Sequence, residues 1–332
     1  MKRFTDKEGS FETKVPVTWK YHLSDSNIHT FQEYEKWKFD AFQISLREMT
    51  STEEKGRFNA LIQDAEVIDI GEKKFYRLDD RVDDDFTVKG WTTKYGDTRV
   101  IFTLTHANEP DEDLDAKPIQ EKVDIAHKIL ADFRLIGADK RQDHINSYLF
   151  DMFLQGVGAT ALILNRAVEN KAFFEATCIL GNQIDALLRI AVVLKLQIVN
   201  SNMVIEREWI HQGLTDKKKS EKDVYKKALE LGVINQDKFD ELYRLYDDRN
   251  KVIHRFIISD ITLAEVEEIA YAYYQMQTSV NKIIYDIEAE QISLGVGITI
   301  ASNGEQTEQS NLDYIKGKIG KLDYFDEPPR TN

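Results

Sequence analysis

The sequence has very little cysteine. Among 332 residues there is a single one, Cys178, which excludes a disulfide framework within the chain. Proteins without disulfides are typical of reducing compartments, so we expect a cytoplasmic location. Cys178 lies in the apolar helical pattern of residues 174–180, where a small buried hydrophobic residue is expected rather than a nucleophile.

Long apolar segments are also scarce. The most apolar window, residues 187–199, is interrupted by Arg189 and Lys195, and its length is below the roughly 20 residues that cross a bilayer as a helix. Residues 1–14 contain basic side chains but no apolar core of a secretory signal. The sequence therefore predicts a soluble protein with no membrane partner.

Patterns that bind metals or nucleotides are lacking too. Six of the seven histidines show neither zinc-protease nor zinc-finger spacing: His22, His29, His106, His127, His144 and His211. Gly156-Val157-Gly158 has no preceding strand and no later glycine, unlike a dinucleotide-binding turn. We therefore expect no metal and no cofactor.

Basic residues are outnumbered, with 44 Lys and Arg against 58 Asp and Glu, a net charge of −14. This balance repels nucleic acid at long range, so an RNA site would have to depend on a local basic patch. Hydrophobic residues make up 42% and charged residues 31%, which is typical of globular domains, and the length suffices for two of them.

The pattern along the chain predicts an α+β domain followed by a helical one. Residues 1–138 are expected to form the mixed domain, of sensory or regulatory role, residues 139–292 an all-α bundle, and residues 293–332 a polar tail. In the first domain we expect a strand at 15–21, helices at 30–49, 51–65 and 118–137, and hairpins at 66–78 and 86–105. In the second we expect helices at 143–168, 171–198, 220–232, 236–256 and 262–290.

One charged residue lies on an apolar helix face. Within residues 239–256 the apolar stripe is expected to contain Phe239, Leu242, Tyr246 and Ile253, and Arg249 continues it between the last two. A guanidinium on a core-facing stripe needs a partner, because an unpaired buried charge is costly. Arg249 is therefore the most informative residue of this helix.

The same helix has an amide and an imidazole close to Arg249. Asn250 and His254 are four residues apart and share a helix face. Arg249 and His254 are separated by about 140° around the axis of a straight helix, but the length of arginine and the nearby helix end allow them to converge. One short segment thus offers a permanent cation, an amide and an imidazole.

This residue set suits cleavage of the RNA backbone without a metal. The 2′-hydroxyl must lose a proton as it attacks the adjacent phosphate, and an imidazole of near-neutral pKa can accept that proton. The phosphorane gathers negative charge, which a fork-shaped guanidinium stabilises.

The segment Arg249-Asn250-Lys251-Val252-Ile253-His254 resembles the R-(polar)-x-x-x-H signature of HEPN domains. The preceding helix, residues 225–234 with a Gly turn, is also similar, and the resemblance covers roughly residues 143–290. It implies a helical homodimer with two motifs at a two-fold interface. Many family members are endoribonucleases that act as toxins or in antiviral defence. The resemblance implies that Arg249 and His254 are the catalytic positions here and that Asn250 is the accessory polar residue.

The resemblance also implies further partners and one difference. RNA would be the substrate, and an antitoxin or regulatory protein a second partner. Some family toxins have a Tyr two residues after the His, which a partner nucleotidyltransferase modifies; here that position is Phe256. This puts that regulation in doubt, but not the ribonuclease chemistry.

Local basic residues give the candidate RNA-binding surface. They are Lys217, Lys218, Lys219, Lys251 and Arg255. A run of this kind is equally typical of a solvated loop and helix face, and a structural alternative holds for the motif as well. In that alternative Arg249 pairs with a carboxylate such as Asp185, and His254 caps the helix end. The corresponding function is a catalytically inactive module that dimerises and binds a nucleotide or a protein partner.

Overall fold

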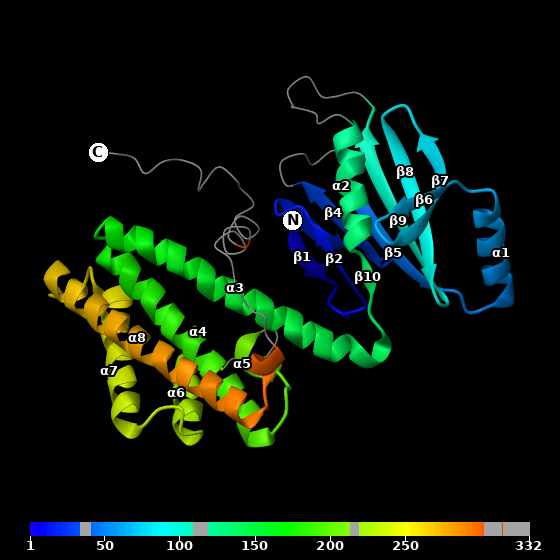
Figure 1. The fold of residues 1–332 in the computed structure, drawn as a ribbon. Coiled ribbons are helices and arrows are strands. Elements are labelled where there is room, and N and C mark those ends of the chain that lie inside the picture. The colour runs from blue at the N-terminus through cyan, green and yellow to red at the C-terminus, as the bar shows by residue number, and fades with distance from the viewer. Residues whose placement is uncertain (34–40, 109–118, 213–218, 302–313, 315–332) are drawn as a thin grey trace. The chain divides into compact units, whose positions relative to one another are not determined.

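A computed structural model describes residues 1–33, 41–108, 119–212, 219–301 and 314. The chain forms two compact units, which contain residues 1–141 and 142–314. The first unit is rich in β-strands and the second is helical (Figure 1). This confirms the predicted order of an α+β region followed by an all-α region.

The first unit contains two antiparallel sheets. The small one has the order β1-β2-β10, formed by Lys2–Thr5, Phe11–Val15 and Arg134–Leu135. The large one has the order β3-β4-β5-β9-β8-β7-β6. Its strands are β3 (Trp19–Leu23), β4 (Ile28–Glu33), β5 (Ala41–Glu48), β6 (Val67–Ile70), β7 (Lys73–Val82), β8 (Phe86–Tyr95) and β9 (Thr98–Ala107).

Aromatic side chains fill the core of this unit. Helix α2 (Ile119–Asp132) packs over the sheets, and the Oγ1 of Thr13 on β2 donates to the carbonyl of Ile129 at 2.8 Å. Seven large aromatic side chains are fully buried in this core: Phe11, Phe31, Phe42, Phe75, Trp91, Phe102 and Phe133. The alternating burial of strands such as β9 follows from the two-residue period of side chains in a sheet.

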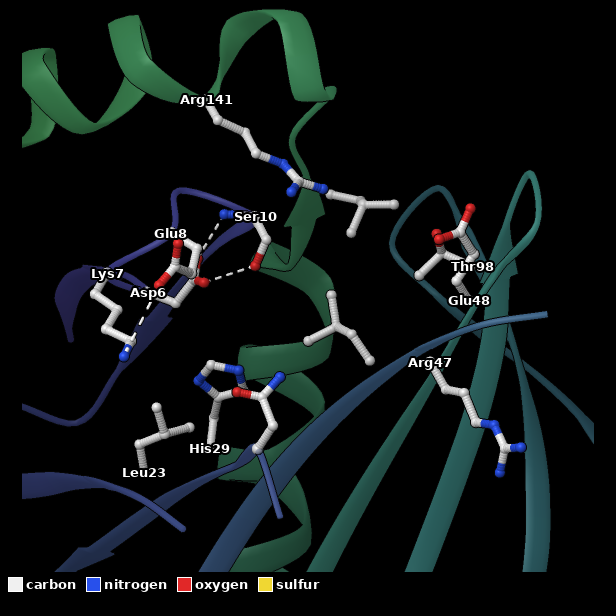
Figure 2. A pocket seen from close by; sticks show the side chains of 13 residues that line it. Asp6, Lys7, Glu8, Ser10, Leu23, His29, Arg47, Glu48, Thr98 and Arg141 are labelled. Carbon is white, nitrogen blue, oxygen red and sulfur yellow. Dashed lines mark hydrogen bonds and ion pairs between the residues drawn. The ribbon is translucent and has the colours of Figure 1, made fainter. Parts of the chain in front are cut away.

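A polar cavity of about 350 Å³ lies beside the β1–β2 turn (Figure 2). Asp6 borders this cavity, but its carboxylate stabilises the turn, because Oδ1 accepts hydrogen bonds from the backbone amides of Ser10 and Phe11. His29, also on the wall, is buried and its Nδ1 lies 3.0 Å from the hydroxyl of Tyr21. These contacts stabilise the fold of the first unit.

The predicted helix over residues 30–49 is wrong. Residues 28–33 and 41–48 form β4 and β5, which pair with each other and with β3 and β9. The Thr30 to Glu33 spacing resembles a capping box, yet Phe31 points into the sheet core, opposite Phe42. Non-local pairing of a half-buried strand outweighed the local capping signal.

Several other local signals in the first unit are confirmed, whereas the predicted helix at 118–137 ends at Asp132 and residues 134–135 form strand β10. Helix α1 (Thr52–Gln63) begins with a capping box of Ser51 and Glu54, and the two hairpins turn at Gly71 and Gly96, both with positive φ. The predicted strand at 15–21 is divided, since residues 16–18 form a turn between β2 and β3. Pro118 and the acidic segment before it lie outside the described residues.

The helical unit is arranged around one buried helix. Its helices are α3 (Arg141–Glu169), α4 (Phe173–Asn200), α5 (Arg207–Ile210), α6 (Glu221–Glu230), α7 (Gln236–Arg255) and α8 (Leu263–Leu294). Helix α4 lies in the middle and contacts α5, α6, α7 and α8 (Figure 1). Short 3₁₀ turns occur at Ala138–Lys140 and Ile298–Ala301, the latter within the predicted polar tail.

Two helices have the length and composition of a membrane span, residues 138–169 and α4. The apolar window of α4 is mostly buried among the other helices, as expected for the core helix of a bundle. The window of α3 is mostly not buried in the structure. Residues 187–199 thus belong to a helix of 28 residues, close to the predicted helix at 171–198, and the expectation that this apolar segment is too short to cross a bilayer is wrong.

Candidate active site

Arg249 occupies a core-facing position of α7. The buried residues of this helix are Leu242, Leu245 and Val252, and Arg249 completes their three- and four-residue spacing. Ile253, which the sequence placed on the stripe, is partly exposed instead. The buried face is therefore shifted by less than one residue, with Leu242 and Arg249 common to the predicted and the observed stripe, and Arg249 faces α4 and α6.

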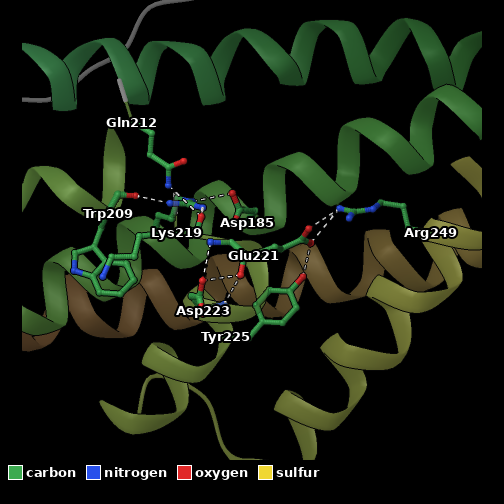
Figure 3. Close-up of polar contacts among 10 residues, drawn as sticks. Asp185, Trp209, Gln212, Lys219, Glu221, Asp223, Tyr225 and Arg249 are labelled. Carbon is green, nitrogen blue, oxygen red and sulfur yellow. Dashed lines mark hydrogen bonds and ion pairs between the residues drawn. The ribbon is translucent and has the colours of Figure 1, made fainter. Parts of the chain in front are cut away.

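The guanidinium of Arg249 forms an ion pair with Glu221 at the start of α6 (Figure 3). Its Nη1 lies 2.8 Å from Oε2 and 3.1 Å from Oε1 of that carboxylate. The side chains of Arg249 and Glu221 are only 12% and 13% exposed. Two opposite charges are therefore paired at the edge of the helical core.

Only one nitrogen of the guanidinium contacts this carboxylate. Nη2 points to Oδ1 of Asn250 at 3.4 Å, a weak contact, and the guanidinium carbon lies 5.0 Å from the centre of the Tyr246 ring. Nε is buried without a hydrogen-bond partner among the described residues. A Cβ at Gly181 on α4 would lie 2.8 Å from Cδ of Arg249, so close packing against this glycine fixes the stem of the arginine.

Glu221 is the first residue of α6, after the capping residue Ser220. Its carboxylate also accepts a hydrogen bond from the hydroxyl of Tyr225, one turn later on the same face. Burial raises the pKa of Glu221 above its ordinary value, although Arg249 and Tyr225 act in the opposite direction. Burial and the neighbouring Glu221 also raise the pKa of Tyr225. The carboxylate is thus held in place at an electrostatic cost.

Asp185 pairs within its own helix rather than with Arg249. Its Oδ2 accepts from Nε of Arg189 at 2.8 Å. The same arginine donates through Nη1 and Nη2 to the carbonyls of Trp209 and Lys219, both at 3.0 Å (Figure 3). The structural alternative that joined Arg249 to Asp185 is therefore wrong in its partner. Arg189 instead attaches the chain on both sides of residues 213–218 to α4.

Sequence analysis missed Glu221, although a signal was present. Glu221, Val224, Tyr225 and Ala228 follow the three- and four-residue spacing of one helix face, and the last three are buried. An acidic residue on the inward stripe of one helix and Arg249 on that of the next are complementary. Two charges of opposite sign that face the same core are expected to pair.

His254 lies on the last turn of α7 and is exposed. Among the described residues no hydrogen bond joins it to Arg249 or Asn250, and Asn250 is half-buried. The structure therefore brings Arg249 and Asn250 together and places His254 about one turn further on. Its ring is accessible to a substrate that approaches the end of α7.

The predicted RNA-binding residues differ in their surroundings. Lys219 pairs with Glu208 at 3.2 Å and lies over the Trp209 ring, and Lys251 pairs with Asp248 at 2.9 Å, which raises the pKa of Lys251. Arg255 is exposed. Lys217 and Lys218 lie outside the described residues. Two of the three described positions are thus compensated by acidic neighbours.

The turn after α7 exposes apolar side chains next to His254. Ile257 is 94% and Ile258 81% exposed, and Leu263 at the start of α8 is exposed as well. Phe256 packs against Phe174 of α4, with ring centres 5.9 Å apart. We call Ile257, Ile258 and Leu263 the α7–α8 turn patch. Adjacent apolar side chains with this exposure are unfavourable in water and typical of contact surfaces.

Within the residues that the structure describes, no group of three or more His, Cys, Asp or Glu side chains is arranged to hold a metal ion. No protein-family model matches the chain, and no curated protein matches it.

The fold was also compared with solved structures. A crystal structure of a protein from Bacteroides thetaiotaomicron VPI-5482 shares 13% identity over 56% of this chain and 76% of that one, with a TM-score of 0.32. The solution structure of cyanobacterial PsbP (CyanoP) from Synechocystis sp. PCC 6803 shares 15% identity over 41% of this chain and 92% of that one, with a TM-score of 0.28. Similarity at this level carries no functional argument.

Proposed function

We propose that the helical unit is a metal-independent endoribonuclease of the HEPN type that acts as a homodimer. The observation that supports this most is the end of α7, where an exposed imidazole follows a guanidinium whose Nη1 alone is bound by Glu221. Nη2 has only the weak contact with Asn250. The fork can therefore bind Glu221 through one nitrogen and a phosphate oxygen through another.

In the proposed reaction an unprotonated ring nitrogen of His254 takes the proton of a ribose 2′-hydroxyl. The 2′-oxygen forms a bond to the adjacent phosphorus, and the bond from phosphorus to the 5′-oxygen breaks. The leaving 5′-oxygen takes up a proton from an imidazolium or from water. The products are a 2′,3′-cyclic phosphate and a free 5′-hydroxyl, while Arg249 stabilises the charge of the phosphorane.

The homodimer is proposed from the α7–α8 turn patch. Ile257 and Ile258 directly follow the motif helix, so a second copy that covers them would bring two motif helices close together. Two copies would also bring two exposed Arg255 side chains together, which favours an anionic ligand between them. In this proposal the first unit senses a signal or restrains the nuclease, as in a toxin or a defence effector.

The test is RNA cleavage by the purified full chain in the presence of EDTA. We expect wild type to cleave tRNA or long RNA and His254→Ala to lose about 10²–10⁴-fold in rate, the usual effect of removing a general base. His22→Ala is the matched control, because this histidine is exposed and lies in the other unit. Equal cleavage by wild type and His254→Ala would refute the proposed role of His254.

A second candidate function is a helical module that binds a nucleotide or protein partner without catalysis. Charge compensation favours it, because Glu221, Glu208 and Asp248 neutralise Arg249, Lys219 and Lys251. It predicts no RNA cleavage but a rise of the melting temperature with a nucleotide such as ATP. Robust cleavage that depends on His254 would remove this candidate.

A further inference from the structure

We infer that Glu221 is a positioning residue for Arg249, and this inference rests on the proposed ribonuclease function. Glu221 contacts no atom of a substrate in this scheme; it acts through the guanidinium. The juxtaposition that carries the inference is a buried acid on the inward face of α6 against a buried arginine on the inward face of α7.

The ion pair of Glu221 and Arg249 has a defined geometry. Both carboxylate oxygens of Glu221 lie within hydrogen-bond distance of Nη1 of Arg249. Gly181 leaves room for the arginine stem on the opposite helix, and Tyr246 faces the guanidinium. Contacts from α4, α6 and α7 thus fix the orientation of the fork, so that Nη2 is directed to Asn250.

The carboxylate of Glu221 is itself held in place. Tyr225, which is fully buried, donates its hydroxyl proton to Oε1 of Glu221. Ser220 caps the helix at this point, with its side chain accepting from the amide of Asp223. These contacts restrict the position of the carboxylate, and the carboxylate therefore sets the position of the guanidinium.

Glu221 orients Arg249 without occupying both Nη nitrogens of the guanidinium. A carboxylate that gripped both Nη nitrogens would exclude a phosphate from the fork. Here both contacts of Glu221 are with Nη1, whereas Nη2 has the 3.4 Å contact with Asn250, and this weak contact is the one that a phosphate oxygen would replace. Precise placement of a catalytic cation matters, because a displacement of about 1 Å costs roughly 10²-fold in rate.

Steady-state kinetics with a short RNA test the inference in the full chain. Glu221→Ala removes the support, and we expect kcat to fall about 10²-fold while KM changes little. Glu221→Gln retains Oε1, which accepts from Tyr225 and from Arg249, but it removes the negative charge and replaces Oε2, the atom 2.8 Å from Nη1, by an amide group. We therefore expect kcat to fall in this variant as well, but less than in Glu221→Ala. Glu230→Gln is the matched control, because the side chain of Glu230 is 66% exposed and lies at the other end of α6, where it pairs with Lys227. Glu221→Ala with wild-type kcat, or Glu221→Gln with a raised kcat, would overturn the inference.

A second readout does not need cleavage. In ¹⁵N NMR the guanidinium protons of Arg249, assigned through Arg249→Lys, should show restricted rotation in wild type, weaker restriction in Glu221→Gln and averaging in Glu221→Ala. Equal averaging in all three proteins would overturn positioning whatever the activity. A wild type that cleaves no RNA yet shows a rigid Arg249 would reject the proposed function and retain the structural pairing.

Discussion

Replacing Arg249 by Met should destabilise the helical unit in a strongly pH-dependent manner. Methionine retains the length that packs beside Gly181 and Tyr246, but it removes the charge that compensates Glu221. An uncompensated buried charge costs about 3–5 kcal/mol. This range applies to Glu221, because its side chain is only 13% exposed. For a unit of this size we expect a decrease of roughly 6–20 °C in Tm at neutral pH.

The pH dependence follows from the direction of the pKa change. Burial already raises the pKa of Glu221 above 4.5 in wild type, and loss of Arg249 raises it further. A carboxyl with a raised folded-state pKa contributes its stability fully below the unfolded-state pKa, and loses it as pH rises through the folded-state pKa. The cost of Arg249→Met should thus be small at about pH 5 and large at about pH 8.

Thermal and urea unfolding followed by circular dichroism at 222 nm measures this, because the helices dominate that signal. Arg244→Met on the exposed face of α7 is the control and should change little. Adding Glu221→Gln to Arg249→Met should restore most of the lost stability at about pH 8, since the uncompensated charge disappears. A cost that is equal at both pH values, with no rescue by Glu221→Gln, would refute the reasoning.

Three further predictions concern the same unit. Gly181→Ala should lower the free energy of unfolding by about 1–3 kcal/mol, because its Cβ would lie 2.8 Å from Cδ of Arg249; urea unfolding measures this, and an unchanged midpoint would contradict it. The double variant Ile257→Asp with Ile258→Asp should convert the proposed dimer to a monomer at unchanged helix content, as measured by light scattering; a dimer that persists would rule out this patch as the interface. Thr262→Ala removes the N-cap of α8 and should cost about 1 kcal/mol, and a chemical denaturation curve that overlays wild type would argue against the cap.

The elements that could be predicted from sequence were those whose signals are local. Capping boxes at Ser51 and Thr262 start α1 and α8 as expected, and Gly71 turns its hairpin with positive φ. The error over residues 30–49 arose where a capping pattern competed with strand pairing. β4 pairs with β3 and β5, and β5 also pairs with the distant β9, and a spacing rule within a few residues does not detect such pairing between strands.

At the candidate active site, too, local features could be predicted from the sequence and contacts between helices could not. The need of Arg249 for a carboxylate followed from its place on an apolar stripe, whereas the identity of the partner depended on how α6 packs against α7. Asp185 was the wrong choice because it forms a local pair with Arg189, four residues later. The exposed Ile253 reflects a small error in the predicted stripe, which the buried Val252 corrects.

The end of α7 is proposed to cleave RNA through attack of the 2′-hydroxyl. The most direct measurement compares one RNA oligonucleotide with its fully 2′-O-methylated form, in EDTA, with analysis of the product ends. We expect fragments with 2′,3′-cyclic phosphate and 5′-hydroxyl ends from the unmodified RNA and no fragments from the 2′-O-methylated RNA. Cleavage of both substrates, or products with 5′-phosphate ends, would contradict it.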